Sequence, residues 1–279
     1  MVKLATVVNC PRTETEFGLG SSIMLLGSCF ASAMADKFAE SGFNTVCNPF
    51  GTLYNPASIA SAIKKLDSDD LFCESDCVQM GAGDGRICSF SHHSSFARES
   101  AGEFLKNANA RLQQAREFWK NCDRVIITLG TAMVWKHGGK VVSNCLKRPA
   151  KEFSHEMLEL QQIRELLRGI VEKHPEKSFL FTVSPIRHLA QYARDNTVSK
   201  SALHLALYQE KLPYFPAFEI LMDQLRDYRF YAEDLVHPSK VAVDIIWEAF
   251  LNCAVPQKDR AAIEQNVKLS KAASHERRS

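Results

Sequence analysis

The stretch "SSIMLLGSCFASAMADKF", residues 21–38, decides the fold class. Four large apolar residues in a row (23–26) are typical of a strand that is buried on both faces of a parallel sheet. Apolar residues then recur at helical spacing over residues 30–41, and Gly42 suits the position just after a helix. The stretch therefore predicts a buried strand that leads directly into an amphipathic helix, with Cys29 at the turn.

The same alternation continues along the chain. Two more strand candidates are "DRVIITLG" (123–130) and "KSFLFTVSP" (177–185). Helical patterns cover residues 56–65, 101–120, 156–173, 199–211 and 240–252. This order predicts an α/β fold of the flavodoxin-like kind, a three-layer α/β/α sandwich with a mostly parallel central sheet.

Two glycine-rich segments interrupt this order. "CVQMGAGDGRICSF" (77–90) and "AMVWKHGGKVVSN" (132–144) each place a turn between short β-prone runs, which predicts two inserted β-hairpins. We expect a single domain over residues 1–255. Residues 256–279 are polar and mixed in charge, so we expect a tail that is either a frayed helix or disordered.

Charge and cysteine usage limit the class of partner. Lys and Arg number 34 and Asp and Glu 32, which leaves a formal net charge of +2 and no field that would recruit nucleic acid or a membrane surface. Nine scattered cysteines without a basic-then-apolar leader favour a reducing cytoplasm. The longest apolar runs fall short of the roughly 20 residues of a spanning helix. We expect a cytoplasmic protein without nucleic-acid or membrane partners. The sequence does not indicate the number of subunits.

Cys29 occupies the position where ligands bind in open α/β sheets, beyond the carboxyl end of a strand. The unpaired amides at a helix N-terminus favour a thiolate, which could attack a carbonyl carbon. The alternative is that Cys29 is a small buried hydrophobe, as most cysteines are. A base would raise the odds, and "FYAEDLVHPSKVAVDII" (230–246) offers one, because Asp234 could orient His237. Ser239 could cap the helix that follows.

The motif Gly27-Ser28-Cys29-Phe30-Ala31 resembles the GSCFA-domain family. The resemblance continues through five further segments and covers the chain to about residue 252. These segments are "NPFGTLYNPASIA" (48–60), "ITLGTAMVW" (127–135), "TVSPIRH" (182–188), "YFPAFEI" (214–220) and "DYRFYAEDLVHPS" (227–239). That family is grouped with the SGNH or GDSL-like hydrolases, so the resemblance implies an SGNH-like three-layer fold and ester hydrolysis or acyl transfer.

The resemblance also implies roles for individual residues. Cys29 stands where the serine nucleophile would be, and Ser28 falls on an aspartate position. Asp234 and His237 match the last-block DxxH. Gly51 is the candidate for the glycine whose amide donates to the oxyanion.

The third block is where the sequence departs from that pattern. The usual Gly-x-Asn-Asp is replaced by Gly-Thr-Ala-Met at residues 130–133, which removes an asparagine amide. Losing one oxyanion donor can cost about 10²- to 10³-fold in turnover. Thr131 and Asn144 are the nearest substitutes.

Other polar residues have weaker claims on the site. Arg187 and His188 follow the strand at 177–185 and would suit an anionic or polyhydroxylated substrate, although Arg187 could equally tie its loop to a carboxylate. His93 could contact substrate. His92 and His93 point apart on extended backbone and are poor joint metal ligands, so we expect no metal. No phosphate-binding glycine loop follows a strand, and we expect no cofactor.

The leading hypothesis is an SGNH-like hydrolase or acyltransferase that acts on a small-molecule or carbohydrate acyl substrate through Cys29, His237 and Asp234. The second is a catalytically silent binding module on the same fold. A metal-dependent hydrolase that uses His92, His93 and His188 is a distant third.

Overall fold

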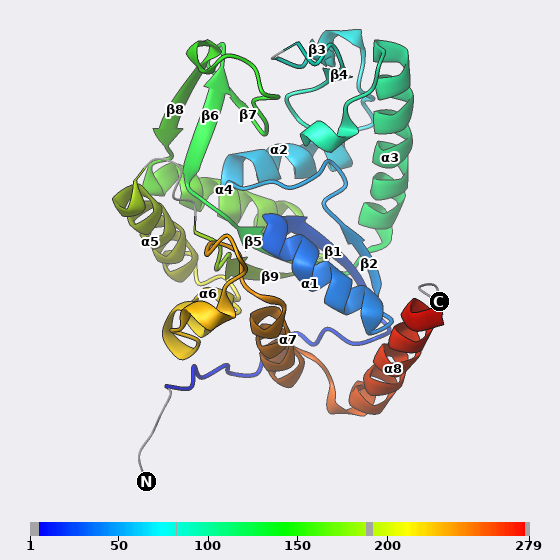
Figure 1. Cartoon of the computed structure of the whole chain (residues 1–279), viewed down its shortest axis with the longest axis vertical. Coiled ribbons are helices and arrows are strands. Elements are labelled where there is room, and N and C mark those ends of the chain that lie inside the picture. Colours follow the sequence, from blue (N-terminus) through cyan, green and yellow to red (C-terminus); the bar gives the residue numbers. More distant parts are fainter. Residues whose placement is uncertain (1–5, 82, 188–191, 277–279) are drawn as a thin grey trace.

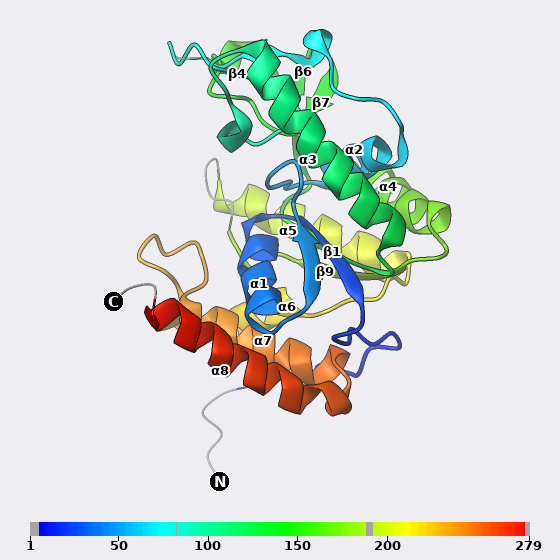
Figure 2. The ribbon, with the colours of Figure 1, turned by 90° about the vertical axis from the view of Figure 1, so that its right-hand side faces the viewer.

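The computed structural model describes residues 6–81, 83–187 and 192–276. Its centre is a four-stranded sheet in which every pairing is parallel (Figures 1 and 2). In spatial order the strands are β2 (Asn44–Cys47), β1 (Ser22–Gly27), β5 (Arg124–Leu129) and β9 (Ser178–Val183). The predicted α/β class with a parallel central sheet is confirmed.

Side chains of the central strands are buried on both faces, as the continuous apolar runs predict. In β1, Met24 and Leu26 point into one hydrophobic core, and Ile23 and Leu25 point into the other. All four side chains are fully buried. The sheet therefore separates two cores, each of which needs a layer of helices.

Helices supply both layers (Figure 2). One core is covered by α2 (Pro56–Asp67), α3 (Ala101–Asn121), α4 (Leu160–Lys173) and α5 (Ala193–Gln209). The other is covered by α1 (Cys29–Glu40), α6 (Ala217–Glu219), α7 (Lys240–Ala254) and α8 (Arg260–Glu276). Six short helical turns complete the list: Glu74–Asp76, Ser94–Phe96, Ala150–Glu152, Ile220–Gln224, Tyr228–Phe230 and Gln257–Asp259.

Helix ends follow the local sequence signals. Asn55 caps α2 by accepting from the Ser58 N–H at 2.8 Å, and Ser239 caps α7. Gly42 follows Ser41, the C-cap residue of α1, and has a φ of +85°, where residues with a side chain are strained. The predictions for Gly42 and Ser239 are confirmed.

Both predicted hairpins are present, and one of them is larger than expected. The first pairs β3 (Val78–Gln79) with β4 (Ile87–Cys88). The second pairs β6 (Met133–His137) with β7 (Lys140–Val142) and with a third strand, β8 (Phe153–Met157). Because β8 takes up residues 153–157, α4 begins at residue 160, and the expected start at 156 is wrong.

The segment after residue 255, for which the sequence left a frayed helix or disorder open, contains α8. Ile263 is only 2% exposed in the second core, and the Asn266 side chain donates to the Ser41 carbonyl at 3.0 Å. Contacts from the first half of the helix thus hold it against the second core and the end of α1. Across the described part of the chain, no helix is long and apolar enough to cross a membrane.

Candidate active site

The turn between β1 and α1 requires glycine at its first position. Gly27 has a φ of +140°, and a Cβ there would overlap the Thr128 carbonyl of the neighbouring strand. The Ser28 N–H donates to that same carbonyl at 3.1 Å, and α1 begins at the next residue, Cys29. The sheet edge therefore fixes the backbone that carries the sulfur.

Ser28 has a structural position in this turn. Its side chain is fully buried, and its hydroxyl caps α1 by accepting from the Phe30 N–H at 3.3 Å. The hydroxyl is thus committed to the helix end, and the predicted role of Ser28 in binding substrate stays a prediction.

Asp234 and His237 form a closed loop just before α7. One carboxylate oxygen of Asp234 accepts from the N–H groups of Val236 and His237 at 2.9 Å each. The other lies 2.6 Å from His237 Nδ1. The backbone donors, the His237 N–H first, lower the pKa of Asp234 to about 2, so the carboxylate is ionised at all ordinary pH values.

The imidazole of His237 also meets the sulfur, from the other end of the chain. Cys29 Sγ lies 3.4 Å from His237 Nε2, across a separation of 208 residues. Because Nδ1 faces a carboxylate it carries the proton, which leaves Nε2 of the neutral ring as an acceptor for the thiol. The three groups stand in series, sulfur to imidazole to carboxylate.

The protonation of Cys29 differs from the expectation drawn from the helix N-terminus. Burial raises the pKa of the thiol, and this outweighs the N–H groups of Cys29 and Phe30 and the charge of Lys200, which all lower it. The resting sulfur is therefore a thiol. The amides ease its ionisation without completing it.

Gly51, the expected oxyanion donor, is differently engaged. Its N–H donates to the Asn48 carbonyl at 2.8 Å and closes a tight turn after β2, so the amide is engaged in this conformation and its predicted donor role stays a prediction. Within the described chain, the N–H groups of Cys29 and Thr52 donate to no other residue. The Leu53 N–H donates to the Gly27 carbonyl at 2.8 Å, which places the preceding residue, Thr52, beside the turn between β1 and α1.

Asn48 is a site residue that the sequence analysis missed. Its φ of +44° turns the side chain back to the turn between β1 and α1, residues 27–29, which we call the elbow. There Oδ1 accepts from the Gly27 N–H at 2.8 Å. Its Nδ2 donates to the Ser32 hydroxyl, one turn after Cys29, at 3.3 Å. Asn48 thereby joins strand, elbow and helix. The Asn-Pro pair that opens a turn was the available signal.

A pocket of about 470 Å³ begins one helical turn beyond the sulfur. Its polar lining includes Ser32, Asp36, Asn48, Thr52, His93 and Arg111. Gly51 is required here as well, because a Cβ at its φ of +88° would overlap the His93 side chain. His93 Nδ1 accepts from the Ser95 N–H at 3.3 Å, so in the neutral ring Nε2 is a donor.

Thr131 and Asn144 are held by protein contacts of their own. The Thr131 hydroxyl lies 2.9 Å from the Ser199 hydroxyl and accepts from the Met133 N–H. The Asn144 side chain accepts from the Leu146 N–H at 2.8 Å within its own turn. Thr131 lines a second, smaller pocket of about 200 Å³. Neither is bonded to Cys29 or His237.

The remaining predicted positions separate. Arg187 is half-buried beyond β9. Burial raises the pKa of Tyr231, in the loop before α7, and the Arg187 charge lowers that pKa in part. His188 lies outside the described residues. His92 is fully buried among phenylalanine rings, and burial lowers its pKa to about 4. Among the residues described, no group of three His, Cys, Asp or Glu side chains could hold a metal ion.

A family model, that of the GSCFA family, matches residues 22–250. The chain belongs to the GSCFA family. The match includes the elbow, the turn after β2 and the loop with Asp234 and His237. No curated protein matches this GSCFA chain.

Solved structures give weak likenesses. A protein assigned to the lipolytic G-D-S-L family from Desulfitobacterium hafniense is 11% identical, with a TM-score of 0.45 over 84% of this chain and 99% of its own. An acetylxylan esterase from Geobacillus stearothermophilus is 12% identical, with a TM-score of 0.41 over 86% of this chain and 96% of its own. Likenesses of this strength do not say what the GSCFA chain acts on.

Proposed function

We propose that this GSCFA-family protein is an SGNH-like hydrolase or acyltransferase that attacks an acyl ester, or a related carbonyl, with Cys29. One observation carries the proposal: Cys29 Sγ, the His237 imidazole and the Asp234 carboxylate lie in series at 3.4 and 2.6 Å. Nucleophile, base and orienting acid need this order for acyl transfer.

The proton relay follows from the thiol state of Cys29. His237 Nε2 accepts the thiol proton as the sulfur attacks, a C–S bond forms, and the carbonyl electron pair moves onto oxygen. When the intermediate collapses, the bond to the leaving alcohol breaks and the imidazolium returns the proton to that oxygen. Water or an acceptor hydroxyl then cleaves the thioester by the same relay and restores the thiol.

Amides would receive the charge on oxygen. The Cys29 N–H would be the first donor to the oxyanion, and the Thr52 N–H would be the second, in place of the Gly51 N–H. The polar pocket that begins at Ser32 favours a substrate whose alcohol carries further hydroxyl groups, such as a sugar or another small molecule. Its side chains offer both donors and acceptors.

Acyl transfer to Cys29 is tested by intact-protein and peptide mass spectrometry with p-nitrophenyl acetate and an acetylated xylo-oligosaccharide. We expect an acyl adduct on Cys29 that hydroxylamine removes, and no adduct or turnover in Cys29→Ala. Cys47→Ala is the matched control, because Cys47 lines the pocket that begins at Ser32 but its pKa is raised by burial to about 12. Full turnover by Cys29→Ala would contradict the proposal.

A silent binding module is the second candidate, and the engagement of the Gly51 amide with Asn48 favours it. In that case the parent protein and Cys29→Ala would bind the xylo-oligosaccharide equally by calorimetry, and neither would form an adduct or turn over. The two candidates thus give opposite results in the same pair of proteins.

A further inference from the structure

A buried lysine lies behind the proposed nucleophile. Lys200 of α5 is 3% exposed, and its ammonium donates to the Ser184 carbonyl at 2.7 Å. No carboxylate of the described residues lies within ion-pair distance of it. A buried ammonium with a single carbonyl partner is costly, so an anion is expected nearby at some stage.

The sheet places this ammonium near the elbow. Ser184 follows β9, and its N–H donates to the Leu129 carbonyl of β5, which in turn pairs with β1. Neighbouring strands are about 4.8 Å apart, so the backbone of Ser184, which holds the ammonium, lies about 10 Å from the backbone at Cys29.

The helix that carries Lys200 is anchored on the loop that lacks an amide side chain. The Ser199 hydroxyl accepts from the Ala132 N–H at 2.7 Å and contacts Thr131. Lys200 is the next residue along α5. The helix position next to Lys200 is therefore fixed against the loop where an asparagine donor is missing.

The electrostatic effects point the same way. Burial lowers the pKa of Lys200 to about 7, and Cys29 is the group that raises it. The other titratable side chain in its field is His204, one turn along α5, whose pKa is lowered by burial and by Lys200 but raised by Glu219. Lys200 in turn lowers the pKa of Cys29, and Asp234 raises it.

We propose that Lys200 is a positioning residue whose buried positive charge stabilises negative charge at the elbow, first on the Cys29 sulfur and then on the oxyanion. This rests on the proposed role of Cys29 as nucleophile. It assigns to a charge about 10 Å away the task that a side-chain amide would otherwise have.

The test is the rate of Cys29 alkylation by iodoacetamide as a function of pH, followed by peptide mass spectrometry in the full-length protein. At pH 6, where the Lys200 ammonium is still charged, we expect the rate in Lys200→Met to fall about tenfold, because a unit charge about 10 Å away at an effective dielectric constant of about 20 raises the thiolate population by about that factor. Above about pH 8, where Lys200 is largely neutral, the two rates should converge. Lys200→Gln, which keeps a donor for Ser184 and removes only the charge, should behave like Lys200→Met.

Lys177→Met is the matched control. Lys177 is also buried and donates to two backbone carbonyls, but at the opposite edge of the sheet, so its removal should leave the Cys29 alkylation rate at pH 6 unchanged. An unchanged rate at pH 6 in folded Lys200→Gln would overturn the inference. A lowered rate in the variant, with no ester turnover by the parent protein, would keep it and refute only the catalytic proposal, because alkylation needs no substrate.

Discussion

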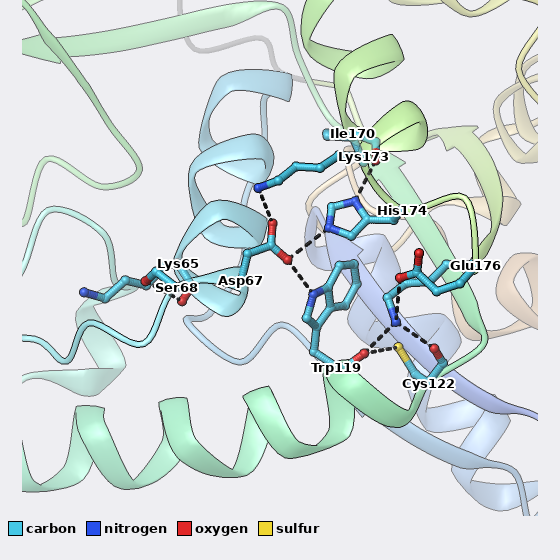
Figure 3. A network of polar contacts seen from close by, with 10 residues as sticks. Lys65, Asp67, Ser68, Trp119, Cys122, Ile170, Lys173, His174 and Glu176 are labelled. Atoms are coloured by element: carbon cyan, nitrogen blue, oxygen red, sulfur yellow. Dashed lines mark hydrogen bonds and ion pairs between the residues drawn. The ribbon is translucent and has the colours of Figure 1, made fainter.

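The central sheet has an amino-terminal edge and a carboxyl edge, formed by the two ends of its strands, and buried polar groups are paired differently at the two. At the amino-terminal edge, Asp67 accepts from Trp119 at 2.9 Å and from Lys173 at 2.8 Å, and lies 3.0 Å from His174 Nε2 (Figure 3). The buried ammonium of Lys177, close by, has two carbonyl partners. These contacts join α2, α3 and α4 over the start of the strands.

At the carboxyl edge the partners are incomplete. Cys29 and His237 share one contact at 3.4 Å, and the buried ammonium of Lys200 has one carbonyl. The difference separates stability from function: satisfied polar networks rigidify a layer, whereas unsatisfied charges and donors are held ready for a ligand. Changes at the two edges should therefore affect different measurements.

Asp234→Asn is the sharpest way to break this comparison. The amide keeps an oxygen for the Val236 and His237 N–H groups but does not hold the Nδ1 proton, so the imidazole loses its tautomer. We expect the acylation rate of Cys29 to fall by about 10²- to 10⁴-fold with little change in melting temperature. Asp227→Asn, in the same exposed stretch, is the control, because Asp227 caps the Tyr228–Phe230 turn and pairs with Arg229 at 3.8 Å.

An unchanged acylation rate in Asp234→Asn would mean that His237 is not oriented by this carboxylate. Since the pKa of Asp234 is about 2, protonation of this group cannot account for activity lost above about pH 4.

Asp67→Ala tests the other edge. It leaves three donors unpaired, and we expect a loss of about 2–4 kcal/mol in the free energy of unfolding by urea titration. Asp67→Asn, which keeps one acceptor oxygen, should cost less. Cys29 acylation should be unaffected in both, and a fall in acylation that matches Asp234→Asn would show that the two edges are not separate.

The pH dependence of the Asp67 contribution has a definite sign. Burial raises the pKa of this carboxyl, but the hydrogen bonds from Lys173, His174 and Trp119 outweigh it and hold the pKa below the ordinary value. Its stabilising effect is therefore complete above the ordinary pKa of about 3.9 and is lost as the pH falls.

Much of this arrangement could be predicted from local sequence. Continuous apolar runs identify β1, β5 and β9, because strands buried on both faces leave no polar positions. The strand β2 was missed because four residues, "NTVC", at a sheet edge with partial exposure make no apolar run. The helix α5 starts six residues before the pattern at 199–211, since its first turns are polar.

Site residues that belong to recognisable motifs could be predicted from the sequence, whereas those defined by their burial in the fold could not. The elbow at Cys29 and the pair Asp234 and His237 stand out in the sequence. Gly51 was assigned by position, but a hydrogen bond inside its own turn uses the amide. Lys200 shares a helical stripe with Leu203 and other buried residues, a signal that sequence can give, but its burial of 97% follows only from the packed fold.

Stability against pH is the finest test of the contrast between the two buried lysines. The pKa of Lys200 is about 7 in the folded protein and about 10.4 when unfolded, so between these values the folded state binds fewer protons and its stability rises with pH. Below about pH 7 the cost of burying the ammonium is complete. We therefore expect Lys200→Met to be most stabilised relative to the parent near pH 6 to 7, with the difference shrinking towards pH 10. Urea unfolding of both proteins across this range measures it, and Lys200→Gln should show the same trend because it also lacks the titrating group. Parallel stability curves for parent and variant would mean that the Lys200 charge is already compensated, which would remove the difference between the two edges of the sheet.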